Sequence, residues 1–163
     1  ERVSSDVSKR LHSRLANCQA FFSSPALRCI KTYQAVFVEN PLPLQIKEFW
    51  EQDFGNWEGL TYSSIPDQGE LSGKDLVEFT PPNGESFLEL CHRTQPPLLK
   101  IISERKVGEI AIFAHAGVIR SFLALALDSK ELALKFSIDN LSITAIEALS
   151  NGQFSISFVN QSV

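Results

Sequence analysis

The sequence lacks several features that mark special classes of protein. None of its apolar runs approaches the roughly 20 residues that a membrane-spanning helix needs, and its first residues carry no signal-peptide pattern. Its three cysteines (Cys18, Cys29 and Cys91) and three histidines do not have the spacing of a zinc site. We therefore expect a cytoplasmic protein with reduced thiols, without a membrane partner and without a metal or other cofactor.

An excess of basic residues is also lacking. The chain has 15 Lys and Arg against 19 Asp and Glu, which gives a net charge of −4 and argues against nucleic-acid binding. A small cationic pocket for a phosphorylated metabolite remains compatible with this charge. At 163 residues, 44% of them apolar, the chain is predicted to form a single domain over residues 1–163 with an ordinary core. Nothing in the composition indicates an oligomeric state.

The most informative segment surrounds His115. Residues 110–114 are apolar, His115 follows, and Gly117 leads into an apolar helical pattern. This order is typical of a buried parallel strand that feeds a helix. His115 is then expected at the carboxyl end of the strand, where α/β sheets bind ligands and helix N-termini favour anions. The alternative is a core histidine that satisfies a backbone carbonyl.

A second junction of this kind occurs near the start of the chain. Residues 19–22 form a candidate strand, Ser24 suits a helix N-cap, and Pro25 suits the first helical position. Arg28 then falls in the first helical turn, where the helix dipole disfavours a cation. An anion shared by the helix end and the guanidinium would explain the position. A solvated arginine is the alternative.

Residues 48–59 interleave four acidic residues with two Trp and two Phe. Aromatic side chains beside a carboxylate exclude water and raise its pKa. A carboxylic acid that stays protonated near neutral pH can act as a general acid. For any single acid here, the alternative is a solvated side chain on a loop that packs against the core through its aromatics.

The remaining pattern predicts alternating helices and strands. We expect a helix in residues 3–17, an extended segment at 44–47 and a loop or mobile cap at 60–84. A helix is expected to begin at 85, to break at Pro96-Pro97 and to resume over 98–104. A strand over 137–149 and a hairpin turn at Asn151-Gly152 should follow, with an antiparallel strand through 154–158 at the sheet's edge.

Four motifs in order resemble the histidine phosphatase superfamily, in its phosphoglycerate-mutase-like branch. They are Ser23-Ser24-Pro25-x-x-Arg28, Glu51-x-Asp53-Phe54-Gly55-x-Trp57-Glu58-Gly59, Pro82-Asn83-Gly84-Glu85-Ser86-Phe87 and His115-Ala116-Gly117-Val118-Ile119-Arg120. The resemblance implies a three-layer α/β/α fold with a mostly parallel sheet. It also implies a phosphomonoesterase that transfers a phosphoryl group to a histidine and then hydrolyses the phosphohistidine, without a metal.

The resemblance also implies roles for individual residues. Arg28 and His115 would bind the phosphoryl oxygens and stabilise the transition state, with the backbone N–H of Ala116 beside them. Glu51 would protonate the leaving oxygen and later activate water. Within the branch, the chain is most similar to α-ribazole-5′-phosphate phosphatases of cobalamin synthesis. Its partner would then be a small phosphorylated metabolite.

One element of the family pattern is missing from residues 1–163. The family's nucleophilic histidine lies in an Arg-His-Gly motif at the end of a first, central strand, and this sequence has no such motif. The helix expected in residues 3–17 matches the family helix that follows this strand, so the resemblance implies that both the strand and the nucleophile lie upstream of Glu1. Neither His12 nor His92 follows a candidate strand. Two alternatives remain. One is a non-catalytic phosphate-binding protein of this fold. The other is a phosphoglycerate mutase, for which residues 60–84 offer little basic surface.

Overall fold

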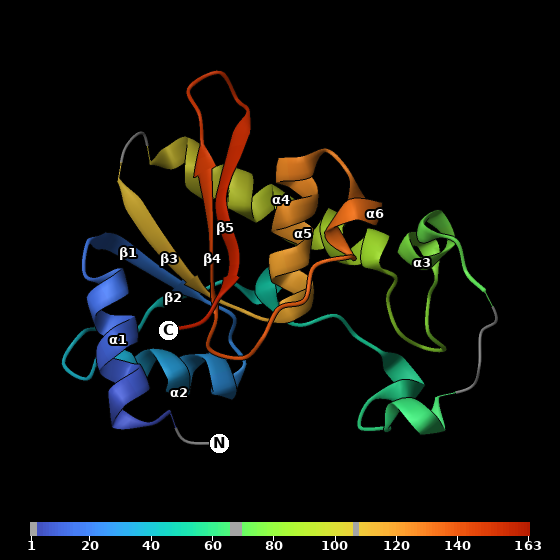
Figure 1. Cartoon of the computed structure of the whole chain (residues 1–163), viewed down its shortest axis with the longest axis horizontal. Coiled ribbons are helices and arrows are strands. Elements are labelled where there is room, and N and C mark those ends of the chain that lie inside the picture. Colours follow the sequence, from blue (N-terminus) through green and yellow to red (C-terminus); the bar gives the residue numbers. More distant parts are fainter. Residues whose placement is uncertain (1–2, 66–69, 106–107) are drawn as a thin grey trace.

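Two β-sheets lie between two layers of helices in the computed structural model, which describes residues 3–65, 70–105 and 108–163 (Figure 1). One sheet is parallel, with the strand order β2-β1-β3, and the other is the antiparallel pair β4-β5. The strands are β1 (Cys18–Ser23), β2 (Leu44–Gln45), β3 (Glu109–Phe113), β4 (Ile143–Ala148) and β5 (Phe154–Gln161).

Helices connect the strands and cover the sheets. They are α1 (Ser5–Leu15), α2 (Leu27–Val36), α3 (Gly73–Glu78), α4 (Phe87–Glu104), α5 (Ala116–Leu127) and α6 (Lys130–Ala133), with 3₁₀ turns at Lys47–Phe49, Gly55–Trp57 and Tyr62–Ser64. Serine hydroxyls cap four of the helices, because Ser4, Ser72, Ser86 and Ser129 accept backbone N–H groups that have no partner within the helix. None of the helices in the described ranges is long and apolar enough to cross a membrane.

The side chains of the parallel strands alternate between two hydrophobic cores. Phe22 and Ile112 face the core built with α4 and α5, whose centre includes the fully buried Leu90. Phe21 and Phe113 face the core built with α1 and α2 around Tyr33. Strands that are apolar on both faces are typical of a sheet covered by helices on both sides. The expected α/β architecture with a parallel sheet is therefore confirmed.

The pairing of β1 with β3 brings two distant segments together. The two strands run parallel, and Ser23 lies opposite Phe113 at their carboxyl ends. The prediction of a buried strand leading into a helix before and after His115 is confirmed, because β3 ends two residues before it and α5 begins immediately after it. Ser24 follows β1 in the same way, so both polar side chains lie at one edge of the sheet.

The start of α2 differs from the prediction. The helix begins at Leu27 with Ala26 as its N-cap, two residues later than a cap at Ser24 would place it. The hydroxyl of Ser24 instead accepts the N–H of Ala26 at 3.2 Å, which bends the chain before the helix starts. Arg28 still lies in the first turn, as predicted.

The predicted break at Pro96-Pro97 is wrong. Helix α4 runs unbroken over 18 residues with both prolines inside it. Buried side chains on either side of the prolines, Leu90 before them and Leu98 and Ile101 after them, belong to one core. Packing along the whole helix therefore outweighs the hydrogen bonds that the prolines cannot donate.

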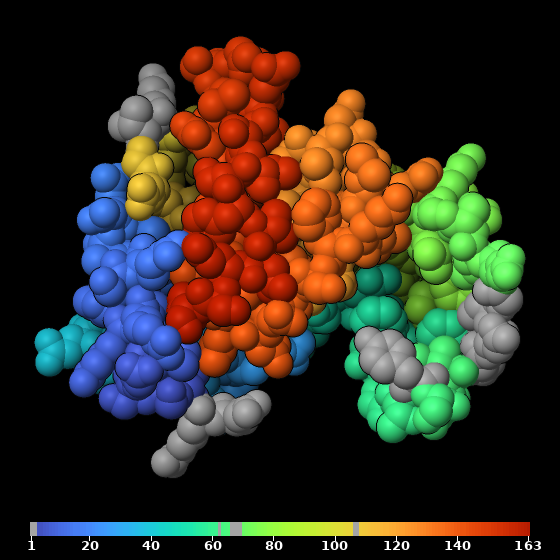
Figure 2. Space-filling view, in the orientation of Figure 1, coloured from blue at the N-terminus to red at the C-terminus, as the bar shows by residue number. Residues whose placement is uncertain are grey.

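Two further predictions are corrected in part. Residues 60–84 were predicted as a loop or cap, but they contain α3, whose capping box joins Ser72 and Asp75; residues 66–69 lie outside the described ranges. This part of the chain projects from the body of the protein (green in Figure 2).

The strand predicted over 137–149 is limited to β4, because residues 139–142 form a turn closed by the Ser142 N–H and the Asp139 carbonyl. The hairpin at Asn151-Gly152 is confirmed, although β4 and β5 form a sheet of their own.

The central position of α4 predicts a measurable contrast. Leu90→Ala should lower the free energy of unfolding by about 2–5 kcal/mol, because it opens a cavity where the side chain is fully buried. Leu99→Ala, the same change on the same helix at a side chain that is 43% exposed, should cost less than about 1 kcal/mol. Urea unfolding of both variants measures the difference. Equal losses would mean that α4 does not pack as described.

Candidate active site

Arg28 and His115 are in direct contact. The Arg28 guanidinium donates to His115 Nδ1 from Nε at 3.2 Å and from Nη2 at 3.0 Å. Arg28 comes from the first turn of α2, and His115 is the N-cap residue of α5. The structure therefore brings together the two residues that the sequence placed at separate strand ends.

The hydrogen bonds of His115 define its charge state. Since Nδ1 accepts from Arg28, the ring proton is assigned to Nε2, which lies 2.8 Å from Ser24 Oγ and donates to it. Burial, with the positive charges of Arg28 and Arg93, lowers the pKa of His115 to about 4. His115 is thus a neutral, 94% buried imidazole at neutral pH in this state of the pocket, since 6% of it is exposed.

Glu51 lines the same pocket as Arg28 and His115. Its Oε1 accepts the backbone N–H of Gly117 at 3.1 Å, in the first turn of α5, and that of Gln52 at 2.9 Å. A Cβ at residue 117 would lie 2.5 Å from this oxygen, so glycine is what allows the carboxylate to approach the helix end. The helix N-terminus favours the charged carboxylate there.

Burial nevertheless has the larger effect on Glu51. It raises the pKa of the carboxyl above its ordinary value, against the two backbone hydrogen bonds and the charges of Arg28 and Arg120, which lower it. The direction agrees with the prediction for an acid of the acidic, aromatic segment. Trp57 stacks on Phe79 with ring centroids 5.4 Å apart, and Trp50 is half exposed.

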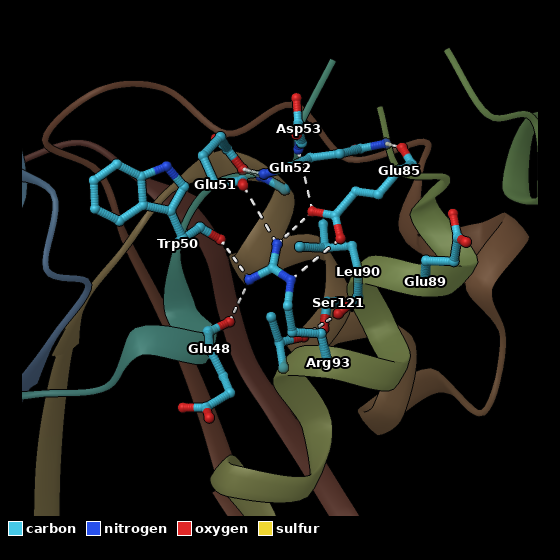
Figure 3. Close-up of polar contacts among 12 residues, drawn as sticks. Glu48, Trp50, Glu51, Gln52, Asp53, Glu85, Glu89, Leu90, Arg93 and Ser121 are labelled. Carbon is cyan, nitrogen blue, oxygen red and sulfur yellow. Dashed lines mark hydrogen bonds and ion pairs between the residues drawn. The ribbon is translucent and has the colours of Figure 1, made fainter. Parts of the chain in front are cut away.

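Arg93 of α4 holds the segment that carries Glu51 (Figure 3). Its guanidinium donates to the backbone carbonyls of Glu48, of Trp50 at 3.1 Å and of Glu51 at 3.3 Å. It also forms an ion pair with the Glu85 carboxylate, in which Nε donates at 3.2 Å. Arg93 thus fixes the backbone on which the Glu51 side chain stands.

Glu85 completes this support. One carboxylate oxygen accepts the backbone N–H of Asp53 at 3.1 Å, and its own backbone N–H donates to the Asp53 carbonyl at 2.8 Å. The side-chain amide of Gln52 donates to the Glu85 carbonyl at 3.1 Å. The sequence analysis missed Arg93. The local pattern contains no signal for it, because Glu85 precedes α4 and the carbonyls that Arg93 binds lie more than 40 residues away in sequence.

Arg28, Glu51, His115 and Ala116 all line one cavity of about 2590 Å³. The predicted meeting of a guanidinium, an imidazole and a carboxyl group is therefore observed. Ala116 is the first residue of α5, where a backbone N–H has no carbonyl four residues before it within the helix. The arrangement offers positive charge, N–H donors and one acid around the same space.

Other candidate groups are less suited to chemistry. The thiol of Cys29 lies 3.7 Å from His115 Nε2, but burial raises its pKa to about 11, so it is not a thiolate at neutral pH. His12, on α1, packs against Phe37 with the two rings tilted and their centroids 5.2 Å apart, and His92 is exposed on α4. Within the described ranges, no three His, Cys, Asp or Glu side chains gather as metal ligands would.

Known proteins include relatives that are similar to this chain in sequence. A bifunctional protein of Mycobacterium tuberculosis is 31% identical over 156 residues, which cover 91% of this chain. The chain spans only 42% of the length of that relative.

Solved structures share the fold at lower identity. The mycobacterial glucosyl-3-phosphoglycerate phosphatase, studied with VO₃, matches with a TM-score of 0.82 at 18% identity, over 99% of this chain and 86% of its own. An Escherichia coli protein provisionally described as an α-ribazole-5′-phosphate phosphatase matches with a TM-score of 0.78 at 20% identity, over 98% and 83% of the two chains. The model of the histidine phosphatase superfamily, branch 1, matches residues 5–162, and this chain belongs to that family.

Proposed function

We propose that the protein is a phosphomonoesterase that acts on a small phosphorylated metabolite through a phosphohistidine. The observation that carries the proposal is the convergence of Arg28, His115 and Glu51 on one cavity at the carboxyl ends of β1 and β3. Pure phosphate binding would use the arginine and the histidine. It would give no reason for a partly buried carboxyl group with a raised pKa in the same place.

In the first step, a histidine nitrogen attacks the phosphorus atom of the substrate. We place this nucleophile upstream of Glu1, as the family resemblance implies. The N–P bond forms as the bond from phosphorus to the ester oxygen breaks, and that oxygen takes the proton of Glu51 as it leaves. The Arg28 guanidinium binds the phosphoryl oxygens and stabilises the charge that develops on them. His115 lies beside them and donates its Nε2 proton to an oxygen in place of Ser24 Oγ.

In the second step, water attacks the phosphohistidine. The Glu51 carboxylate accepts a proton from this water, the P–N bond breaks, and phosphate leaves the free histidine. Glu51 is thereby protonated again and ready for the next substrate. Its raised pKa supports this exchange, because a group that both gives and takes a proton works best when its pKa approaches the working pH.

A screen of phosphorylated metabolites can identify the substrate. We propose α-ribazole 5′-phosphate as the first candidate, since the quoted motifs favour it and one structural neighbour carries that provisional description. Phosphate release by the protein with its upstream segment, measured against α-ribazole 5′-phosphate, 3-phosphoglycerate, phosphoserine and p-nitrophenyl phosphate, tests both activity and preference. Tight binding of inorganic phosphate without any turnover would favour a binding protein instead.

His115→Ala should reduce kcat by about 10²–10³-fold, because it removes a donor to the phosphoryl group and the group that orients Arg28. His92→Ala makes the same change at an exposed site on α4 and should leave kcat unchanged. Steady-state kinetics with p-nitrophenyl phosphate compare the two variants. Normal turnover in His115→Ala would exclude His115 from the reaction.

Glu51→Gln should slow the release of poor leaving groups by about 10²–10⁴-fold, since the amide cannot supply a proton. Release of p-nitrophenolate, a good leaving group, should slow far less. Single-turnover measurements isolate this step from hydrolysis of the phosphohistidine. In the unchanged enzyme, release of the poor leaving group should decrease as the pH rises through the raised pKa of Glu51, and the variant should lose this dependence. Equal slowing of both leaving groups would show that Glu51 is not the acid.

Arg93→Ala should reduce the release of the same poor leaving groups, because the Glu51 segment loses its hydrogen bonds to α4. Combined with Glu51→Gln, it should add little further loss, since both changes act through one carboxyl group. Arg10→Ala, at an exposed arginine on α1, is the matched control. Losses that simply multiply in the double variant would mean that Arg93 does not act through Glu51.

A further inference from the structure

A second and smaller cavity adjoins Glu51. Its volume is about 310 Å³, and its walls include Lys47, Trp50 and Asp53 together with Glu51 itself. This volume lies at the lower end of the roughly 300–1,000 Å³ that small-molecule sites occupy. Glu51 also lines the cavity of about 2590 Å³ described above. The proposed acid is therefore shared by the phosphate-binding cavity and by a second space beside it.

The largest side chain of this second cavity is the half-exposed indole of Trp50. Trp50 belongs to neither of the two hydrophobic cores. The other tryptophan, Trp57, stacks on Phe79, whereas no aromatic ring within the described ranges stacks on Trp50. An indole with an uncovered face presents apolar area and a π surface that another ring can cover. Trp50 is thus a candidate binding surface.

Arg93 fixes this indole relative to the acid, because it donates to the backbone carbonyls of Trp50 at 3.1 Å and of Glu51 at 3.3 Å. Figure 3 shows the indole on the opposite side of the backbone from the guanidinium. The backbone of Trp50 is extended, with φ −58° and ψ 152°, so the Trp50 and Glu51 side chains point in different directions. A ring stacked on Trp50 is therefore separated by a spacer from the ester oxygen that Glu51 protonates.

We infer that Trp50 stacks on a planar heterocycle in the alcohol part of the substrate, and that a group the size of a sugar joins this ring to the phosphate. The substrate class is then a nucleotide-like phosphomonoester, to which α-ribazole 5′-phosphate belongs. Lys47 and Asp53 line the same cavity and offer a donor and an acceptor to the sugar hydroxyls or the ring edge. Stacking uses the π face that every such ring has, so it selects the class and not one base. The inference rests on the proposed function for the phosphate and for Glu51 as the acid.

Phosphate release from matched esters tests the inference. Adenosine 5′-monophosphate and α-ribazole 5′-phosphate carry a ring that ribose 5-phosphate lacks. Trp50→Ala should lower the preference for the two ring-bearing esters over ribose 5-phosphate, measured as a ratio of kcat/KM values, by about 5–150-fold, the effect of removing one aromatic partner of a stacked base. Trp50→Phe keeps an aromatic face and should retain most of the preference. Leu99→Ala, which also truncates an exposed apolar side chain, is the control and should keep all of it.

Tryptophan fluorescence gives a readout that does not depend on turnover. The chain has two tryptophans, so Trp57→Phe leaves Trp50 as the single fluorophore. Both ring-bearing esters should quench its emission, and ribose 5-phosphate should not. Ring-selective quenching without any phosphate release would refute the proposed function and leave the stacking site in place. Absence of ring-selective quenching, or an unchanged preference in Trp50→Ala, would overturn the inference whether or not the protein releases phosphate.

Discussion

The parallel pairing of β1 with β3 is the constraint on which the candidate site depends. It sets Ser23 opposite Phe113. Ser24, which follows β1 directly, and His115, two residues after the end of β3, therefore meet at one edge of the sheet. Residues about 90 positions apart in sequence thereby share hydrogen bonds. The helices that follow each strand bring the rest, because Arg28 and Gly117 lie in their first turns.

Burial and nearby charges together set the pKa values of His115 and Glu51 in the pocket. Burial and Arg28 keep His115 neutral, while burial keeps a proton on Glu51 to a higher pH than usual, although the end of α5 opposes it. A phosphoryl dianion entering beside Arg28 would offset that positive charge and raise the pKa of His115. Binding an anion would therefore also change the proton affinity of the imidazole, which makes His115 a stronger donor in the occupied pocket than in the empty one.

The sequence predicted the local parts of this site better than the supports around them. A strand, a histidine and a glycine before an apolar helix form a local pattern, and the structure has it at residues 110–127. The unbroken α4 depends on burial of Leu90 and Leu98 in a shared core, which no local rule for Pro96-Pro97 contains. The contacts of Arg93 with carbonyls more than 40 residues away depend on the tertiary fold and are equally invisible in the local pattern. The observed start of α2 differs from the predicted one by two residues, which is the range within which helix ends are commonly assigned differently.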